Sequence, residues 1–103
     1  MKRIRILEAA RRDLLAGYGF YEKQAEGIGR YFLDTLYSDI ESLHICSGVH
    51  AVCFGHYHRL LSKRFPWSVY YRIEGNEIRI YAVLDNRRNP DSIKQRLTDD
   101  QAS

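Results

Sequence analysis

The sequence predicts a single α+β domain in the order β-α-α-β-β-β, with a helical hairpin packed on a small twisted antiparallel sheet. Apolar residues recur every three or four positions through residues 8–44, and they alternate with polar ones through much of residues 57–84. A chain of 103 residues is long enough for one core and too short for two. We therefore expect one domain over residues 1–97, followed by a short flexible tail over residues 98–103.

The N-terminal half supplies a strand and the hairpin. Residues 2–7, KRIRIL, alternate charged with apolar side chains and predict a short strand. Helical spacing of apolar residues follows from residue 8 to residue 21, and after a break at residues 22–25 it resumes from residue 28 to about residue 44. Helices joined by so short a connection are expected to lie antiparallel.

Three strands are predicted for the C-terminal half, at residues 57–65, 67–74 and 77–84. Gly75 and Asn76 join the last two as a type II′ turn, which sets the register of the hairpin. One face then pairs apolar residues only: Ile73 with Ile78, Tyr71 with Ile80, Val69 with Ala82, and Trp67 with Leu84. The other face pairs Tyr70 with Tyr81, Arg72 with Arg79, and Glu74 with Glu77. Diagonal pairing of Arg72 with Glu77 or Glu74 with Arg79 would relieve the like charges, and is favoured over an anion-binding role.

Positive charge is concentrated in the C-terminal half. Residues 1–58 contain seven Lys or Arg and seven Asp or Glu, whereas residues 59–96 contain nine and four. Such a basic surface favours an acidic partner, either nucleic acid or an acidic protein segment, although it is also compatible with simple solvation.

All four histidines and both cysteines lie within residues 44–58. Zinc ligands usually come in pairs separated by roughly two to five residues, whereas Cys46 and Cys53 are seven apart and His56 is too close to His58. We therefore predict no metal and no cofactor, and we expect reduced cysteines, with Cys53 as a small buried hydrophobe.

No segment suggests a membrane or an export route. The longest apolar run is far below the roughly 20 residues of a membrane span, and the N-terminus lacks the apolar core of a secretory signal. We expect a cytoplasmic protein with no membrane partner.

The C-terminal half contains KRFPWSVYYRIE, then IRIYAVLDNRRNP, in a continuous order of strand, turn, two strands and an arginine-rich ending. With AARRDLLAGYGFYEKQ in the first helix, this pattern resembles the RelE/ParE toxin superfamily over about residues 4–97. The resemblance implies the same β-α-α-β-β-β fold. It also implies a type II toxin–antitoxin system toxin, kept inactive in a hetero-oligomer by a cognate antitoxin that wraps an extended or helical segment over it.

Members of the superfamily differ in target. RelE-like members cut mRNA on the ribosome with several basic residues and a terminal Tyr or His. Here Arg59 and Arg87 occupy two of the basic positions and His58 is a spare proton-transfer candidate. The remaining positions depart from the pattern, with Leu61, Ser68 and Ile93 in place of bases and of the terminal residue. A nuclease of this kind would therefore depend on His58, Arg59 and Arg87.

ParE-like members inhibit DNA gyrase without being nucleases, and they have an FPY turn and an RR.P ending. This chain has FPW at residues 65–67 and RRNP at residues 87–90, so the resemblance favours a ParE-like gyrase inhibitor. The RelE-like ribosome-dependent endoribonuclease is the alternative, and whether the protein is an enzyme stays open; a regulatory binding module is a third hypothesis. The residues expected to bind the target or the antitoxin are Arg59, Lys63, Arg64, Arg72, Arg79, Tyr81, Arg87 and Arg88.

Overall fold

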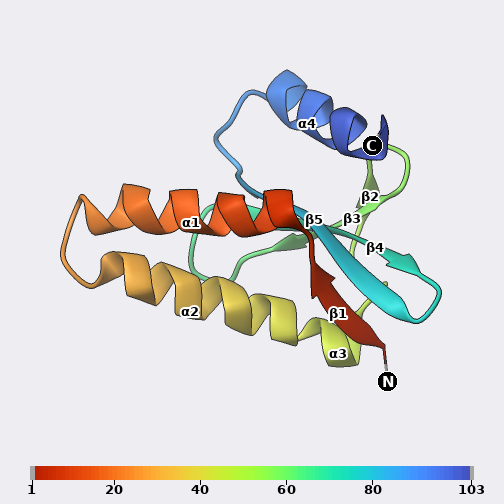
Figure 1. Ribbon diagram of the computed structural model, residues 1–103, viewed down its shortest axis with the longest axis horizontal. Coiled ribbons are helices and arrows are strands. Elements are labelled where there is room, and N and C mark those ends of the chain that lie inside the picture. Colours follow the sequence, from red (N-terminus) through yellow and green to blue (C-terminus); the bar gives the residue numbers. More distant parts are fainter. Residues whose placement is uncertain (1, 103) are drawn as a thin grey trace.

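The computed structural model describes the backbone of residues 2–102 and the side chains of residues 2–98. The predicted β-α-α-β-β-β order is confirmed, with a short helix, a short edge strand and a terminal helix added to it (Figure 1). The elements in chain order are β1 (Arg3–Ile6), α1 (Glu8–Glu22), α2 (Ile28–Glu41), α3 (Leu43–Cys46), β2 (Val52–Cys53), β3 (Tyr57–Leu61), β4 (Trp67–Glu74), β5 (Glu77–Asp85) and α4 (Pro90–Ala102).

The sheet is mixed rather than wholly antiparallel. Its strand order is β1-β5-β4-β3-β2, and β1 lies parallel to β5 while the other neighbours are antiparallel. In Figure 1 the red β1 lies beside the cyan β5, so the first and last strands of the chain are neighbours. The parallel pair needs no tight turn because the whole hairpin and the other three strands lie between its members along the chain. The α+β class is confirmed.

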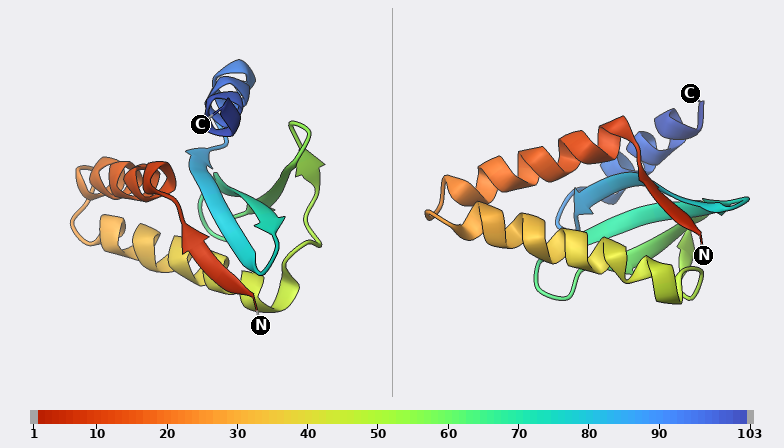
Figure 2. Two further views of the ribbon diagram at one scale, coloured as in Figure 1. Left: turned by 45° about the vertical axis from the view of Figure 1, so that its right-hand side comes forward. Right: turned by 60° about the horizontal axis from the view of Figure 1, so that its bottom comes forward.

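The α1–α2 hairpin covers one face of the sheet. The two helices run side by side (Figure 2), and their buried residues join those of the strands in one core. An aromatic cluster lies near the loop that joins α1 to α2, where the ring of Phe32 is 4.9 Å from Trp67 and 5.2 Å from Phe65 between centroids. Tyr21 packs on the same rings, and its hydroxyl accepts a hydrogen bond from Trp67 Nε1 at 3.0 Å. The buried indole N–H therefore has a partner inside the core.

Helix α4 covers part of the opposite face. Its Ile93 and Leu97 join Tyr57, Tyr70, Ala82 and Leu84 in a second buried cluster, and Tyr57 donates its hydroxyl proton to the carbonyl of Leu97 at 2.9 Å. The helix begins at Pro90, a residue suited to the first turn because no intrahelical partner awaits its missing N–H. Part of the sheet is thus buried on both faces, whereas the sequence predicted only one apolar face.

The predicted hairpin register is confirmed near the turn and wrong beyond Tyr71. Gly75 has the positive φ of 61° that the first position of a type II′ turn requires. Pairing is as predicted for Glu74 with Glu77, Ile73 with Ile78, Arg72 with Arg79, and Tyr71 with Ile80. A β-bulge then leaves Tyr81 unpaired in the ladder, and the later pairs are Tyr70 with Ala82, Val69 with Val83, Ser68 with Leu84, and Trp67 with Asp85.

The bulge explains why both faces of β5 are buried. An extra residue in one strand moves each later side chain of that strand to the opposite face of the sheet. Val83 therefore lies in the core under the hairpin, while Ala82 and Leu84, predicted for that core, belong to the cluster under α4. Tyr81 stays on the α4 side, where its ring lies edge-on to Tyr57 with 5.4 Å between centroids.

The C-terminal segment was predicted to be a flexible tail, and no membrane-spanning segment was expected. The expected tail over residues 98–103 falls mostly on residues whose side chains lie outside the described part of the chain, although the backbone of α4 continues to Ala102. Within residues 2–102, no helix has both the length and the apolar character needed to pass through a bilayer.

Candidate functional site

A pocket of about 220 Å³ opens where β3 and β4 meet the β2–β3 turn and the start of α4. Two arginines, Arg59 and Arg88, line it, and we call it the Arg59–Arg88 pocket. No carboxylate is among its described lining residues. The other lining residues are Cys53, Phe54, Tyr70, Asn86, Pro90 and Ile93.

The guanidinium of Arg59 is held on this side of the sheet by neutral groups. Its Nε donates to Ser68 Oγ at 3.1 Å, and its Nη2 donates to Asn86 Oδ1 at 3.4 Å. Ser68 Oγ donates in turn to Asn86 Oδ1 at 2.5 Å, and the backbone N–H of Asn86 donates to the carbonyl of Pro66 at 2.8 Å. These contacts fix the arginine without removing its charge.

The neighbouring titratable groups are neutral at physiological pH. Burial raises the pKa of the Tyr70 hydroxyl, and the charge of Arg59 only partly opposes that shift. Burial likewise raises the pKa of the Cys53 thiol. Neither side chain supplies an anion to offset Arg59.

Arg88 approaches the pocket from the β5–α4 connection. Its backbone N–H donates to the carbonyl of Asp85 at 3.1 Å, and its Nη2 donates to Ser92 Oγ at 3.0 Å. No ion pair to a carboxylate involves Arg59 or Arg88 among the side chains of residues 2–98. The fold therefore brings two predicted site residues together without an ion-paired carboxylate, although the charge of Arg88 contributes to lowering the pKa of nearby Asp85.

Arg87 is separated from them by its own ion pair. Its Nε and Nη2 donate to the two carboxylate oxygens of Asp85 at 2.9 and 2.6 Å, and its backbone N–H donates to the first of them at 2.8 Å. These hydrogen bonds lower the pKa of Asp85 and raise that of Arg87. Arg87 is not among the residues that line the Arg59–Arg88 pocket.

His58 lies on the other face of β3 from Arg59. Successive residues of a strand point to opposite faces, and the His58 ring stacks on Tyr71 with 5.0 Å between centroids and an interplanar angle of 19°. Its Nδ1 donates to the carbonyl of His50 at 2.9 Å. The structure therefore does not bring together His58, Arg59 and Arg87, the residues a nuclease would depend on.

The histidine-rich segment is organised around the hydroxyl of Tyr71. That oxygen accepts the backbone N–H of Gly48 at 2.9 Å and is hydrogen-bonded to His50 Nδ1. Cys46 and Cys53 are free thiols. Among the described residues, no three His, Cys, Asp or Glu side chains gather closely enough to hold a metal ion.

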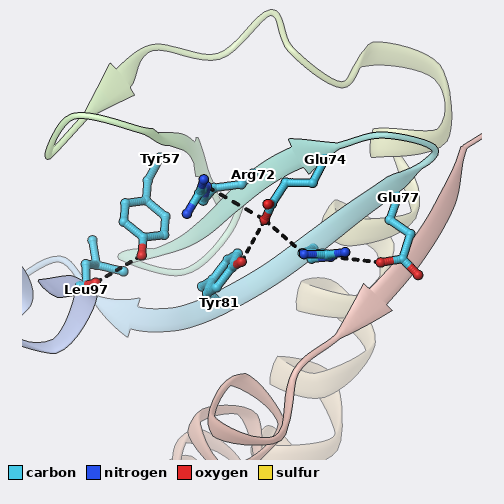
Figure 3. A network of polar contacts seen from close by, with 7 residues as sticks. Tyr57, Arg72, Glu74, Glu77, Tyr81 and Leu97 are labelled. Carbon is cyan, nitrogen blue, oxygen red and sulfur yellow. Dashed lines mark hydrogen bonds and ion pairs between the residues drawn. The ribbon is translucent and has the colours of Figure 1, made fainter. Parts of the chain in front are cut away.

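Arg72, Arg79 and Tyr81 form a partly buried polar network with Glu74 and Glu77 near the β4–β5 turn (Figure 3). The predicted diagonal between Glu74 and Arg79 is present at 3.2 Å, whereas Arg72 lies 3.8 Å from Glu74 rather than near Glu77. Tyr81 donates to Glu74 at 2.8 Å, and Arg79 Nε donates to Glu77 at 2.8 Å. This pairing lowers the pKa of both glutamates.

The network leaves little free charge for a partner. The Arg72 guanidinium carbon lies 5.9 and 5.8 Å from the ring centroids of Tyr57 and Tyr81, so its remaining positive charge is directed at aromatic faces. Two arginines and two glutamates compensate one another locally. The contacts therefore favour a structural role for these residues, in which they pair with one another, over the binding of an anion.

Lys63 and Arg64 belong to a different place. They line a pocket of about 200 Å³ against α2, together with Asp34 and Asp39. Asp39 is buried and accepts a hydrogen bond from Ser62 Oγ at 2.7 Å. The eight residues predicted to bind a partner thus fall into separate groups.

Sequence reasoning missed three residues that line the pocket, Phe54, Tyr70 and Asn86, and it missed the role of Ser68 in holding Arg59. Strand alternation places Tyr70 and Ser68 on one face and could have linked them to each other. The position of Asn86 next to Arg59 depends on where β5 ends and on the bulge, and the local sequence predicts neither of them.

The sequence and the backbone fold of the chain can each be compared with those of known proteins. No protein-family model matches the sequence, and no curated protein matches it. Solved structures do match the backbone, among them a chain from the "Chromosomal ParDE TA system from P. aeruginosa". That match has a TM-score of 0.74 and covers 81% of this chain and 94% of the other. The chain has a RelE/ParE-like fold. The identity is 21%, so the likeness establishes the RelE/ParE-like fold and leaves the activity to be argued from the residues.

Proposed function

We propose that this protein is the toxin of a type II toxin–antitoxin system, of the ParE-like kind, and that it arrests growth by binding a protein target such as DNA gyrase. Two findings support the proposal: the RelE/ParE-like fold and its similarity to a chain of a ParDE TA system. The motifs at residues 65–67 and 87–90 support the ParE-like branch. A cognate antitoxin neutralises the toxin in a hetero-oligomer.

The observation that best supports binding rather than catalysis is the separation of His58 from Arg59 across the sheet. Acid–base cleavage of RNA needs a proton-transfer group beside the cation that stabilises the scissile phosphate. Here the imidazole of His58 is stacked on Tyr71 on one face, while the guanidinium of Arg59 lies on the other. Arg87, the third expected member, is paired with Asp85.

One observation favours the second candidate, a RelE-like ribosome-dependent endoribonuclease. The Arg59–Arg88 pocket presents two guanidinium groups and no described carboxylate, which suits a phosphate. Ile93 occupies the pocket wall where the resemblance expects a Tyr or His. The phenol that lines the pocket is that of Tyr70, whose raised pKa keeps it protonated and makes it a poor general base.

Controlled expression in a bacterium distinguishes the two. The DNA-damage response, double-strand breaks and transcript ends are recorded after induction of the wild type, Arg59→Ala and the control Arg30→Ala. Arg30 is exposed and forms an ion pair with Asp34 on α2. Breaks with intact messages support gyrase inhibition, whereas codon-positioned cuts that vanish in Arg59→Ala overturn it in favour of the nuclease. The absence of any growth arrest contradicts both.

The antitoxin is tested through the neighbouring reading frame. We expect a short gene beside this one that encodes a DNA-binding protein with an acidic, disordered end. Co-expression of that neighbour should restore growth, and its protein product should co-purify with the toxin. Growth arrest that persists despite soluble expression of that neighbour contradicts the pairing.

A further inference from the structure

The Arg59–Arg88 pocket differs from the other arginine clusters because no described carboxylate lines it or forms an ion pair with either arginine. Arg72 and Arg79 are balanced by Glu74 and Glu77, and Arg87 by Asp85. Arg59 instead is hydrogen-bonded to Ser68 and Asn86, and Arg88 to Ser92, all of them neutral. A guanidinium has five N–H donors, so both arginines keep donors that these contacts do not use.

The walls of the pocket are mostly apolar. Phe54 is 38% exposed at the rim, its ring lies 6.5 Å from Tyr70 between centroids, and Pro90 and Ile93 form the α4 side. Apolar walls next to fixed polar donors are typical of a preformed ligand-binding site. The volume of about 220 Å³ is below the roughly 300–1,000 Å³ of sites for drug-sized ligands, so it suits one or two side chains rather than a whole nucleotide.

We propose that the Arg59–Arg88 pocket binds a carboxylate side chain from an acidic protein segment, with an apolar neighbour of that carboxylate lying against Phe54 and Pro90. The carboxylate accepts charge-assisted hydrogen bonds from both guanidinium groups, a geometry that arginine forms better than lysine. The identity of the segment as part of the antitoxin rests on the proposed function; the chemistry of the pocket does not.

The charges around the pocket favour a carboxylate over a nucleic acid backbone. Phosphate backbones bind along a continuous basic groove. Here the next arginine along the chain, Arg87, is neutralised by Asp85, and Asp91 is exposed at the start of α4. A nucleic acid backbone carries a charge at every residue and needs further free cations beside the pocket, whereas a single carboxylate needs only Arg59 and Arg88.

The test uses the full chain, made by cell-free synthesis, with its arginine Nε–H groups observed by NMR. The probes are the capped peptide acetyl-Leu-Glu-Glu-Leu-amide, its Leu-Gln-Gln-Leu counterpart, inorganic phosphate and a ribodinucleotide. We expect the acidic peptide to shift the Arg59 and Arg88 signals and to bind at least about tenfold more tightly than the glutamine peptide. The Arg30 signal should not move.

Variants assign the effect to the pocket. Arg88→Gln, at an exposed residue outside the Ser68–Asn86 contacts, should weaken binding of the acidic peptide by about tenfold, and Arg59→Gln should do the same. Arg30→Gln is the control and should bind as the wild type does. Arg88→Gln keeps the test decisive if Arg59→Gln fails to fold.

Two results would overturn the proposal. One is equal binding of the glutamate and glutamine peptides. The other is a shift of Arg59 and Arg88 with the dinucleotide or phosphate at concentrations where the acidic peptide has no effect. The assay contains no growth readout, so peptide binding by a protein that causes no growth arrest would refute only the toxin function. Growth arrest without peptide binding would refute only the carboxylate site.

Discussion

Asp13 on α1 and Arg96 on α4 form a bidentate ion pair across the edge of the sheet, with distances of 2.9 and 2.8 Å. The same carboxylate accepts the backbone N–H of Val83 at 3.0 Å, two residues beyond the bulge at Tyr81. The side chains of Arg96 and Asp13 are only 21% and 13% exposed. One carboxylate thus joins the hairpin, β5 and α4.

Asp13→Ala should lower the free energy of unfolding by about 2–4 kcal/mol, because it removes the carboxylate that faces a largely buried guanidinium and leaves the Val83 N–H without its acceptor. Glu8→Ala is the matched control on the same helix, since Glu8 pairs with Arg12 at 3.7 Å on the exposed surface, and it should cost less than about 0.5 kcal/mol. Urea unfolding followed by circular dichroism measures both. Equal losses from the two substitutions would contradict the role of Asp13.

Two glycines of α1 should respond in opposite directions to alanine. A Cβ on Gly17 would lie 2.5 Å from the ring of Phe32 and 3.1 Å from Trp67, so Gly17→Ala should destabilise the fold by about 1–3 kcal/mol. A Cβ on Gly19 would meet nothing within 4 Å, so Gly19→Ala should stabilise it by about 0.5–1 kcal/mol through helix propensity. Thermal unfolding of the two variants compares them, and a stabilised Gly17→Ala variant would refute the close packing.

Stability should decrease as the pH falls below 6.5, in part because of His50. Burial, and then the charge of His58, lower the pKa of His50 from its ordinary 6.5. The folded state therefore prefers the neutral ring, whose stabilising effect is complete above pH 6.5 and is lost as the pH falls from there towards the folded pKa. Urea midpoints at about pH 7.5 and 5.5 should differ less in His50→Gln than in the wild type. His56→Gln, at an exposed position, should leave the difference unchanged.

Arg87→Ala should raise the pKa of Asp85. The hydrogen bonds from Arg87 hold the Asp85 pKa below its ordinary 3.8, against the opposing effect of burial. A depressed carboxyl pKa contributes stability above pH 3.8 that is lost as the pH falls through the folded value, so the variant should also lose part of its acid sensitivity. Carboxyl carbon NMR titration measures the pKa. An unchanged Asp85 value would mean that Arg87 does not neutralise it.

Much of the fold was predictable because it depends on near neighbours in the chain. The hairpin helices follow from apolar spacing, and the β4–β5 turn follows from Gly75 and Asn76. The pairing of Arg72 with Arg79 follows from that turn by counting, and so does the relief of their charges through Glu74. These features need no information from the rest of the molecule.

The candidate site was predictable only in part. The residues of the Arg59–Arg88 pocket come from β3, β4 and the start of α4, and Arg59 and Arg88 were both expected to bind a partner. Strand alternation alone separates His58 from Arg59 once the strand is assigned. The sequence did not predict which arginines lack an ion pair, because side-chain geometry decides which carboxylate pairs with which arginine. Asp85 pairs with Arg87, two residues away, whereas Asp13 pairs with Arg96, 83 positions along the chain.

By itself the sequence determined the order of the six main elements, the antiparallel helices and the hairpin register as far as Tyr71 with Ile80, because local spacing and one turn specify them. Only the tertiary structure decided the bulge at Tyr81. An extra residue is compatible with the same local sequence, and its benefit lies in distant contacts, with Ala82 and Leu84 packed under α4. The tertiary structure likewise decided that Arg59 and Arg88 share one pocket without a carboxylate, since that depends on where each carboxylate finds its partner.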